Sequence, residues 1–561
     1  MPSPFDALTL KQAQAALESR KPTDADIEAR DLYEGNHWRE GAGWIGQKPP
    51  EGSPEYDRLI AAIRNAFVSE NVEREVVQRH RAGILGREPR WGFVPRRDLA
   101  DGEEPSEDEQ ARAGEAEAAL TTWWDRRKLL ETLQGALVTA LLMRRAPLRL
   151  FVPSGLRDER GQIAAPTLAA ALDAIHLDAP DPAAAGVFVD DATRREVGIY
   201  AYKRYEPEGG ITFIGVPQSG TGTDVAEVSY VSLAGETPDP EGRDPTALRV
   251  IGEGGVLEEA APPLALGGRI LMHELTREAL VTDQIRQLQK ALNLDLTQML
   301  RNVNLAGSLE RVLINLMPPG QYVDEAGNPW VEGKSTGTKA FKASPMPTGA
   351  GISAFLRGLE IRDKEGNLTG YSPGTVNYRD PVPVGTFVET RDTIYGSMLN
   401  QCDQRHALIS GDAVASGKSR EQARAEFETS LGMSKTAVDE AGRWVLETAA
   451  ALAAIFMGQP GRYDDLRCEF GAIVDAGPLS PEDRQQIVAE YEADLISPET
   501  TLSRLDVDDV DAEIARVEAA RERRDATMVA AVAGRPPGRP GTGQDDPGNA
   551  LRDDLGQGGA A

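Results

Sequence analysis

The clearest hydrophobic pattern in the chain lies between residues 279 and 303. Seven apolar residues recur there at steps of three and four, which places them on one stripe of an α-helix. They are Val281, Ile285, Leu288, Leu292, Leu296, Met299 and Val303. Arg286, Lys290 and Asn293 fall on the other faces, and Thr276 is positioned to cap the start. The pattern predicts a helix of about 25 residues, roughly 37 Å long at ~1.5 Å per residue.

A second helical pattern spans residues 387–409, with Ile394, Met398 and Cys402 on one side. Residues 304–385, which separate the two patterns, hold Gly, Pro and short strand-like runs. We therefore predict two long helices with a small β-containing insert between them. The periodicity leaves one alternative open, a buried helix pair inside an ordinary core.

The chain before this helix pair has two parts. Residues 1–145 are predicted to be mostly helical, with helices at 68–85 and 115–143 and with Gly35 and Gly86 as helix ends. Residues 146–275 instead hold β-branched and aromatic runs separated by Gly, Pro and Asp, which predicts a mainly antiparallel sheet. The expected strands are residues 148–152, 187–189, 197–205, 211–216, 227–231 and 248–251, with further strands at 312–316, 340–342 and 376–378 in the insert.

The chain after the helix pair begins with residues 410–418, whose small polar composition predicts a flexible loop. Residues 419–457 then predict a long helix, and residues 466–470 a strand. Further helices are expected at 481–493, 498–505 and 509–528. From residue 534 Gly, Pro and Asp dominate, which predicts a disordered tail. The fold class is therefore α+β and predominantly helical.

Charge is distributed unevenly along the 561 residues. The 61 Lys and Arg and 89 Asp and Glu give a formal net charge of −28, which globally repels nucleic acid and anionic membranes. Residues 281–420 hold 15 Lys and Arg against 14 Asp and Glu, a net charge of +1, so the remainder carries −29. The predicted helix pair and insert are thus nearly neutral within an acidic protein.

The cysteine count and the hydropathy indicate a soluble intracellular protein. Cys402 and Cys468 are the only cysteines and cannot form a disulfide framework, which favours a reducing compartment. We expect no signal peptide, because residues 1–18 lack a basic start followed by an apolar core. We also expect no transmembrane span, because the apolar runs are too short or carry charges.

One stretch resembles a phosphate-binding loop. Gly417, Lys418 and Ser419 match the end of that motif, in which four residues separate the two glycines. Here five residues separate Gly411 from Gly417, and Asp412 would repel a phosphate. A helix is also expected before the loop, where the motif needs a buried strand. The pattern therefore favours a flexible loop over a nucleotide site.

Other candidate chemistry is also incomplete. His273 and Glu274 match the start of a metalloprotease helix, but Arg277 stands where the second histidine ligand is required. The cysteines lack metal-ligand spacing, and no nucleophile has a positioned base. We therefore predict no enzymatic activity, no metal site and no cofactor.

Basic residues around the predicted loop offer possible contacts to a phosphate backbone. They are Arg405, Lys418, Arg420 and Arg424. Acidic neighbours, however, make a salt-bridged helix surface an equal alternative. These neighbours are Asp403, Asp412 and Glu421.

Taken in order, four stretches resemble the portal proteins of tailed bacteriophages. The first combines Leu32-Tyr33-Glu34-Gly35 with Asn71-Val72-Glu73-Arg74 and residues 84–91, similar to the family's wing helices. The second is the helix over 281–302 entering the insert, similar to the stem and clip. The third is the second helix, the 410–418 loop and the following long helix; the last is residues 496–500 with 508–521. The likeness spans roughly residues 30–530.

The resemblance implies a division of the chain and two sets of functional residues. The division is a helical wing region at 1–145, a β-rich wing region at 146–275, stem helices at 276–303 and 386–409, a clip at 304–385, a tunnel loop at 410–418, a long helix with a return strand at 419–475, a helical crown at 476–530 and a disordered tail at 531–561. The implied DNA-channel residues are Arg405, Ser410, Gly411, Asp412, Ser416, Gly417, Lys418 and Arg420. The apolar stripe defined above would pack the stem helices.

The resemblance also implies an assembly and its partners. Portal subunits form a ring, usually of twelve, at one vertex of the virion capsid, and the ring is assembled in the host cytoplasm. It is the conduit for double-stranded DNA during packaging and ejection. The implied partners are further copies of the chain, DNA, the terminase large subunit, major capsid and scaffolding proteins, and head-tail adaptor proteins, with no membrane. DNA carries one charge per ~1.7 Å, so a nearly neutral lining suits a conduit through which DNA slides.

Two alternatives from other classes are an ATP-driven packaging motor subunit and a structural adaptor of the virion that has no channel. The motor would require a strand-borne phosphate loop, which the sequence lacks. The adaptor would form monomers or open chains instead of closed rings.

Overall fold

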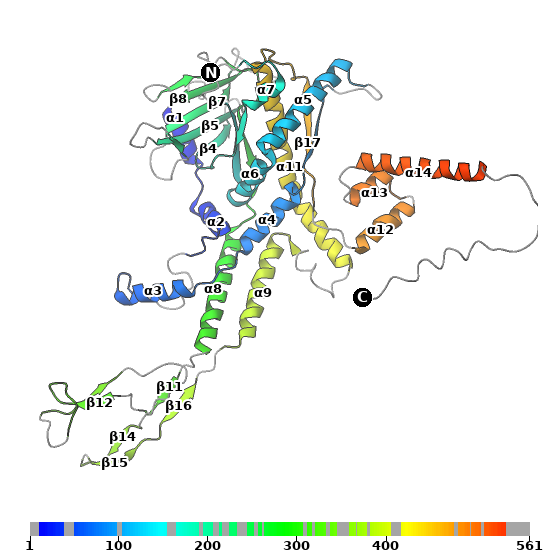
Figure 1. The fold of residues 1–561 in the computed structure, drawn as a ribbon. Helices are drawn as coiled ribbons and strands as arrows, with labels where there is room; N and C mark the ends of the chain where they lie inside the picture. Colours follow the sequence, from blue (N-terminus) through cyan, green and yellow to red (C-terminus); the bar gives the residue numbers. More distant parts are fainter. Residues whose placement is uncertain are drawn as a thin grey trace, which may run out of the picture. The chain divides into compact units, whose positions relative to one another are not determined.

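The computed structural model divides into two compact units, Met1–Gly477 and Pro478–Ala561. It has an α+β fold, in which helices alternate with several small antiparallel sheets (Figure 1). The structure describes residues 10–38, 50–97, 104–153, 164–189, 194–205, 213–215, 224–232, 244–251, 256–260, 263–306, 311–316, 320–331, 337–344, 358–365, 367–378, 382–405, 417–475, 481–493, 495–505 and 510–533.

Four helices open the first unit. They are α1 (Leu10–Ser19), α2 (Asp24–Glu34), α3 (Pro54–Ala66) and α4 (Val72–Leu85). Gly35 ends α2 with φ at 92°, a left-handed conformation that glycine adopts without strain, so the predicted helix end is confirmed. Helix α4 begins at Val72 rather than at residue 68, because the Asn71 side chain accepts a hydrogen bond from the Arg74 N–H and caps the helix.

The single helix predicted for residues 115–143 is wrong. Two helices occupy this region, α5 (Glu107–Arg127) and α6 (Leu129–Met143). They are separated by Lys128, whose φ of 52° is left-handed. Helix α6 is nearly all apolar, and Leu133, Leu137 and Leu141 are fully buried. The break therefore redirects an apolar helix into the core.

The strands predicted between residues 146 and 275 are confirmed and are antiparallel. One sheet has the order β10-β2-β3, and the other has the order β4-β5-β7-β8-β9, with β6 paired to β5. The strands are β2 (Arg145–Phe151), β3 (His176–Asp178), β4 (Ala185–Val189), β5 (Glu196–Tyr205), β6 (Phe213–Gly215), β7 (Asp224–Val231), β8 (Thr246–Ile251), β9 (Leu257–Glu259) and β10 (Met272–Thr276). The short helix α7 (Leu168–Asp173) precedes β3.

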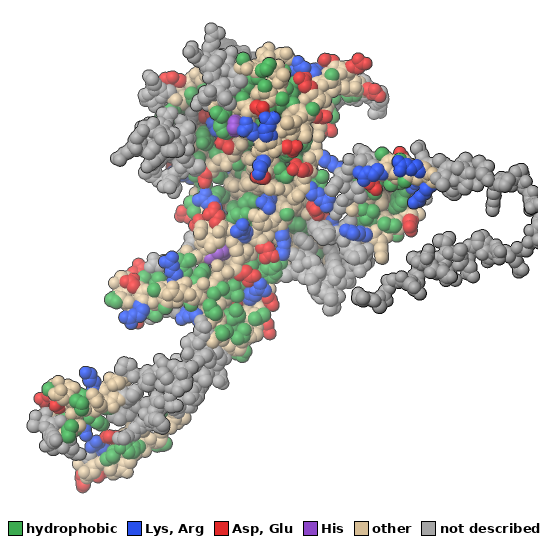
Figure 2. Space-filling view, in the orientation of Figure 1, with side chains coloured by type: hydrophobic (Ala, Val, Ile, Leu, Met, Phe, Trp, Pro, Cys, Tyr) green, Lys and Arg blue, Asp and Glu red, His purple; other side chains and the backbone are tan. Residues whose placement is uncertain are grey.

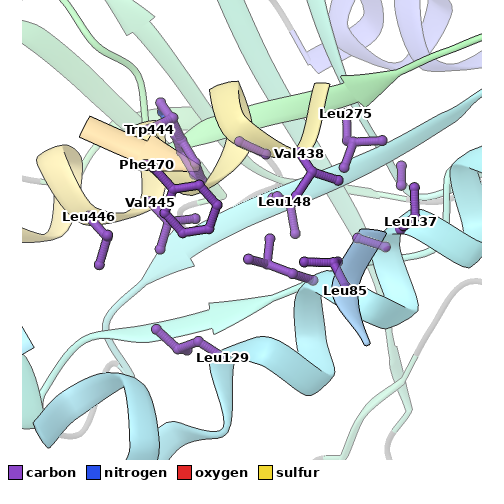
Figure 3. Packing of buried hydrophobic residues seen from close by; sticks show 14 of the residues in the cluster. Leu85, Leu129, Leu137, Leu148, Leu275, Val438, Trp444, Val445, Leu446 and Phe470 are labelled. Carbon is purple, nitrogen blue, oxygen red and sulfur yellow. The ribbon is translucent and has the colours of Figure 1, made fainter. Parts of the chain in front are cut away.

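The main core joins elements from distant parts of the first unit. Leu85 of α4, Leu137 of α6 and Leu148 of β2 converge with Val438 and Phe470 (Figure 3). The last two belong to the long helix α11 (Gly417–Phe456) and to β17 (Leu466–Gly471), which pairs with β1 (Arg90–Pro95). A Cβ added at Gly442 of α11 would lie 2.5 Å from the Phe470 ring, so this glycine permits the close contact between α11 and β17.

The two long helices predicted around the insert are α8 (Asp283–Ala306) and α9 (Val384–Gln401). Helix α9 ends at residue 401 and not at the predicted residue 409, because Cys402 leaves the helical conformation and Asp403 is left-handed with φ at 55°. The insert between them holds three antiparallel strand pairs, β11·β16, β12·β13 and β14·β15. Their strands are β11 (Arg311–Ile314), β12 (Gly320–Val323), β13 (Ala340–Ala343), β14 (Glu360–Arg362), β15 (Leu368–Tyr371) and β16 (Thr375–Tyr378).

Thr276 does not cap α8, contrary to prediction. It pairs with Arg145 at the end of strand β10, which the buried side chains of Met272 and Leu275 anchor in the core. Thr282 caps the helix instead, because its hydroxyl accepts a hydrogen bond from the Ile285 N–H at 3.4 Å.

The second unit contains three helices in its described part, α12 (Pro481–Glu492), α13 (Pro498–Arg504) and α14 (Val510–Ala533). They match the helices predicted in this region, and α14 extends beyond the expected end at residue 528. The predicted tail from residue 534 lies outside the described residues.

Candidate functional site: the α8–α9 helix pair

Helices α8 and α9 pack side by side and are called the helix pair below (Figure 1). The Asn302 side chain joins the two polypeptide segments where the pair meets the insert. Its Nδ2 donates a hydrogen bond to the Val382 carbonyl at 2.7 Å, and its Oδ1 accepts one from the Val382 N–H at 3.0 Å. These two hydrogen bonds hold the end of α8 close to the residues just before α9, at the point where the chain enters and leaves the insert.

Burial falls along the apolar stripe toward the insert. Val281, just ahead of α8, and Ile285 and Leu292 within it are buried in the core. Leu288 and Leu296 are partly buried against the same core, and Met299 is partly buried. Val303, the last residue of the stripe, is 46% exposed. The stripe therefore joins the pair to the body of the unit at one end and is uncovered at the other.

Four valines near the insert are exposed, and we call them the valine end. They are Val303, Val382, Val384 and Val388, which are 46%, 50%, 45% and 44% exposed. Hydrophobic side chains also gather on the visible face of the helix pair in the space-filling view (Figure 2). Clustered exposed apolar side chains mark interaction surfaces more often than isolated ones do.

A buried row of polar side chains on α8, which we call the polar ladder, consists of Gln289, Asn293 and Thr297. Their spacing of four places them on one face of the helix. Thr297 Oγ1 accepts a hydrogen bond from the Val68 N–H at 3.2 Å, and Asn293 Oδ1 accepts one from the Glu70 N–H at 3.2 Å. The ladder therefore provides hydrogen-bond acceptors for backbone N–H groups of the segment that leads into α4.

The first rung of the ladder contacts both this segment and α4. Gln289 Nε2 donates to the Glu70 carbonyl at 2.6 Å, and Gln289 Oε1 accepts from the Glu73 N–H at 3.0 Å. Asn293 Nδ2 also lies 2.9 Å from His37 Nδ1, whose pKa is lowered by burial. Sequence reasoning did not identify this ladder; its only signal was the repeat of polar residues at every fourth position.

Ion pairs and a hydrogen bond hold the helix pair to α2, to α4 and to the segment that leads into α4. Lys290 Nζ lies 2.7 Å from a Glu28 carboxylate oxygen, and Arg286 Nε lies 3.4 Å from the other. On α9, Arg391 makes a two-pronged contact with Glu70 at 2.6 and 3.1 Å, which raises the pKa of the Arg391 guanidinium through these hydrogen bonds. Tyr395 Oη donates to Glu75 at 3.0 Å.

The end of α9 is also fixed to α4. Gln404 is buried, and its Nε2 donates to the Val76 carbonyl at 2.7 Å. Cys402 is buried beside it, and burial raises the pKa of its thiol to about 12. This cysteine is therefore a neutral core residue at physiological pH.

The residues predicted to line a channel are only partly within the described chain. Arg405 is exposed just beyond α9, and Gly417, Lys418 and Arg420 lie in the first turn of α11. Ser410, Gly411, Asp412 and Ser416 lie outside the described residues. The neighbouring Arg424 pairs with Glu428, one helical turn further along α11, at 3.0 Å.

The partial metalloprotease pattern has a structural role. His273 lies on strand β10, stacks on the Trp444 ring at 5.4 Å, and has its pKa lowered to about 4 by burial. Glu274 pairs with Arg20 at 2.7 Å. In the described part of the chain, no three or more His, Cys, Asp or Glu side chains are grouped to hold a metal ion.

No helix among the described residues has the length and hydropathy needed to cross a membrane. The chain matches no protein-family model, and it matches no curated protein.

Proposed function

We propose that this chain is the subunit of a portal-like ring, placed at one vertex of a tailed-phage capsid, through which double-stranded DNA is packaged and ejected. In this proposal the helix pair is the stem, the insert is the clip, and α12–α14 form the crown. The ring also docks the terminase large subunit and the head-tail adaptor proteins.

The observation that carries the proposal is the geometry of the helix pair. Its base is attached to the body by buried apolar residues and by the polar ladder, whereas the valine end is exposed. A helix pair inside an ordinary core would bury the apolar stripe of α8 along its full length, whereas Val303 at the end of this stripe is 46% exposed. Repetition of the chain around an axis would cover the valine end with a neighbouring copy, because closed rings bury the same surfaces in every subunit.

The charge distribution supports a conduit rather than a tight DNA-binding site. Residues 281–420 have a net charge of +1 in a chain of net charge −28. Several basic side chains of this segment are already paired with acids, including Arg286, Lys290 and Arg391. A nearly neutral lining would release few counterions from DNA, so the duplex would be free to slide.

Negative-stain electron microscopy of the purified full-length chain tests the proposal. Closed rings of about twelve-fold symmetry with a central hole are expected. Monomers or open chains would instead support the structural adaptor. ATP hydrolysis by the isolated chain, above the level of a buffer control, would support the packaging motor subunit.

A further inference from the structure

Among the described residues, Glu73 is the one acidic residue with a fully buried side chain at the base of the helix pair. It lies in the first turn of α4 and is 0% exposed. Its backbone N–H is bound by Gln289, but neither carboxylate oxygen has a hydrogen-bond partner among the described residues. Buried carboxylates are normally paired or hydrogen-bonded, so this carboxyl group requires an explanation.

The charged groups around Glu73 come from several elements. Helix α8 contributes Arg286, whose positive charge favours the ionised form of Glu73. Arg286 also forms ion pairs with Glu28 of α2 and with Asp283. Lys290 also pairs with Glu28. The Arg286 charge lowers the pKa of Glu73 and the Glu28 carboxylate raises it, and both effects are smaller than that of desolvation.

The other elements packed on α4 leave Glu73 without a further partner. Beyond the end of α9 lie Cys402 and Asp403, with the Cys402 thiol neutral. Within α9, Arg391 and Tyr395 bind Glu70 and Glu75. Helices α6 and α11 contribute their polar contacts farther along α4, where Gln134 binds the Leu85 carbonyl and Ser434 binds His80.

Burial and the absence of hydrogen bonds both favour the protonated form of this side chain. Desolvation raises the pKa of Glu73 to about 8, with Arg286 acting in the opposite direction. At neutral pH the side chain is therefore a neutral acid inside the joint that α2, α4, α8 and the end of α9 share. Above pH 8 the same position holds a buried carboxylate that accepts no hydrogen bond from the described residues.

We propose that Glu73 is a proton-dependent latch, which closes the joint between the helix pair and the body when protonated and opens it on release of the proton to solvent. The inference does not require ring assembly, because every contact on which it rests lies within one chain. The segments expected to loosen together are residues 68–76, 285–297 and 398–404, which meet at the joint.

Hydrogen exchange of the full-length chain at pH 6 to 9, compared with Glu73→Gln, tests this inference. The exchange-rate ratio of wild type to variant at each pH cancels the chemical effect of pH on exchange. Because the pKa is raised in the folded state, opening of the wild type becomes easier as pH rises from about 4.5 toward 8. The ratio in the three segments should rise roughly tenfold per pH unit below 8 and level off above it.

Glu389→Gln is the control, since Glu389 is an exposed acidic residue of α9, away from the joint. The hydrogen-exchange rates of this control variant should change with pH as those of the wild type do. A Glu73→Gln profile that rises in parallel with the wild type overturns the proposal. If Glu73→Gln does not fold, the infrared spectrum of the wild type decides. A buried carboxylic-acid C=O band present at pH 7 and lost by pH 9 supports the latch, and absence of that band at pH 7 overturns it.

Discussion

Replacement of two valines by serine, Val384→Ser with Val388→Ser, tests whether the valine end is a subunit interface. The two side chains are four residues apart on α9 and lie on one face of the helix. They are 45% and 44% exposed in the single chain, so the substitutions remove little that stabilises the folded subunit. Their main effect should therefore fall on assembly.

The expected magnitude follows from the exposed fractions. Complete burial of a valine side chain contributes about 1.5–3 kcal/mol. A little under half of each side chain remains to be buried by a neighbour, which gives about 1 kcal/mol per valine. The double variant should thus lose about 2 kcal/mol at each interface, or roughly 30-fold in the association constant between subunits.

Mass photometry over a dilution series measures this effect. The concentration at which half of the rings dissociate should rise at least 30-fold for the double variant, since each ring contains several such interfaces. Met433→Ser provides the control, because Met433 is 62% exposed on α11, outside the helix pair. Unchanged dissociation of the double variant, with the control also unchanged, would refute the assignment of the valine end to an interface.

Three further predictions concern the same region. Leu292→Ala should lower the free energy of unfolding by about 2–5 kcal/mol in urea titrations, because Leu292 is fully buried, whereas Val303→Ala should change it by less than about 0.5 kcal/mol. Asn293→Ala should lower the free energy of unfolding by about 1–3 kcal/mol and increase hydrogen exchange at residues 68–71, because the part-buried Glu70 N–H loses its acceptor. Deletion of residues 410–418 should leave rings intact but reduce DNA packaging, and loss of ring formation would count against a channel-lining role.

Periodicity predicted the helix pair because burial on one face imposes a period of 3.6 on any sequence. Glycine likewise marked the end of α2, where Gly35 adopts a left-handed conformation. The break between α5 and α6 carried no such signal. Lys128 adopts the left-handed conformation without being glycine, and it does so because α6 must enter the core.

The polar ladder and the start of α8 depend on contacts that sequence patterns do not encode. Gln, Asn and Thr on a helix normally indicate a solvated face, but Asn293 is buried by a segment 223 residues earlier. Thr276 was expected to cap α8, yet β10 pairs with β2, more than a hundred residues before it. In both places a contact with a residue far away in the sequence determines the local structure, which the neighbouring residues alone do not.

The mass of the native assembly tests the central claim most directly. Native mass spectrometry of the purified 60.5 kDa chain should give a closed species of about twelve subunits, roughly 730 kDa, with no series of intermediate sizes. A mass of 60.5 kDa at all concentrations, or an open-ended series of oligomers, would contradict the proposal that this helix pair builds a ring.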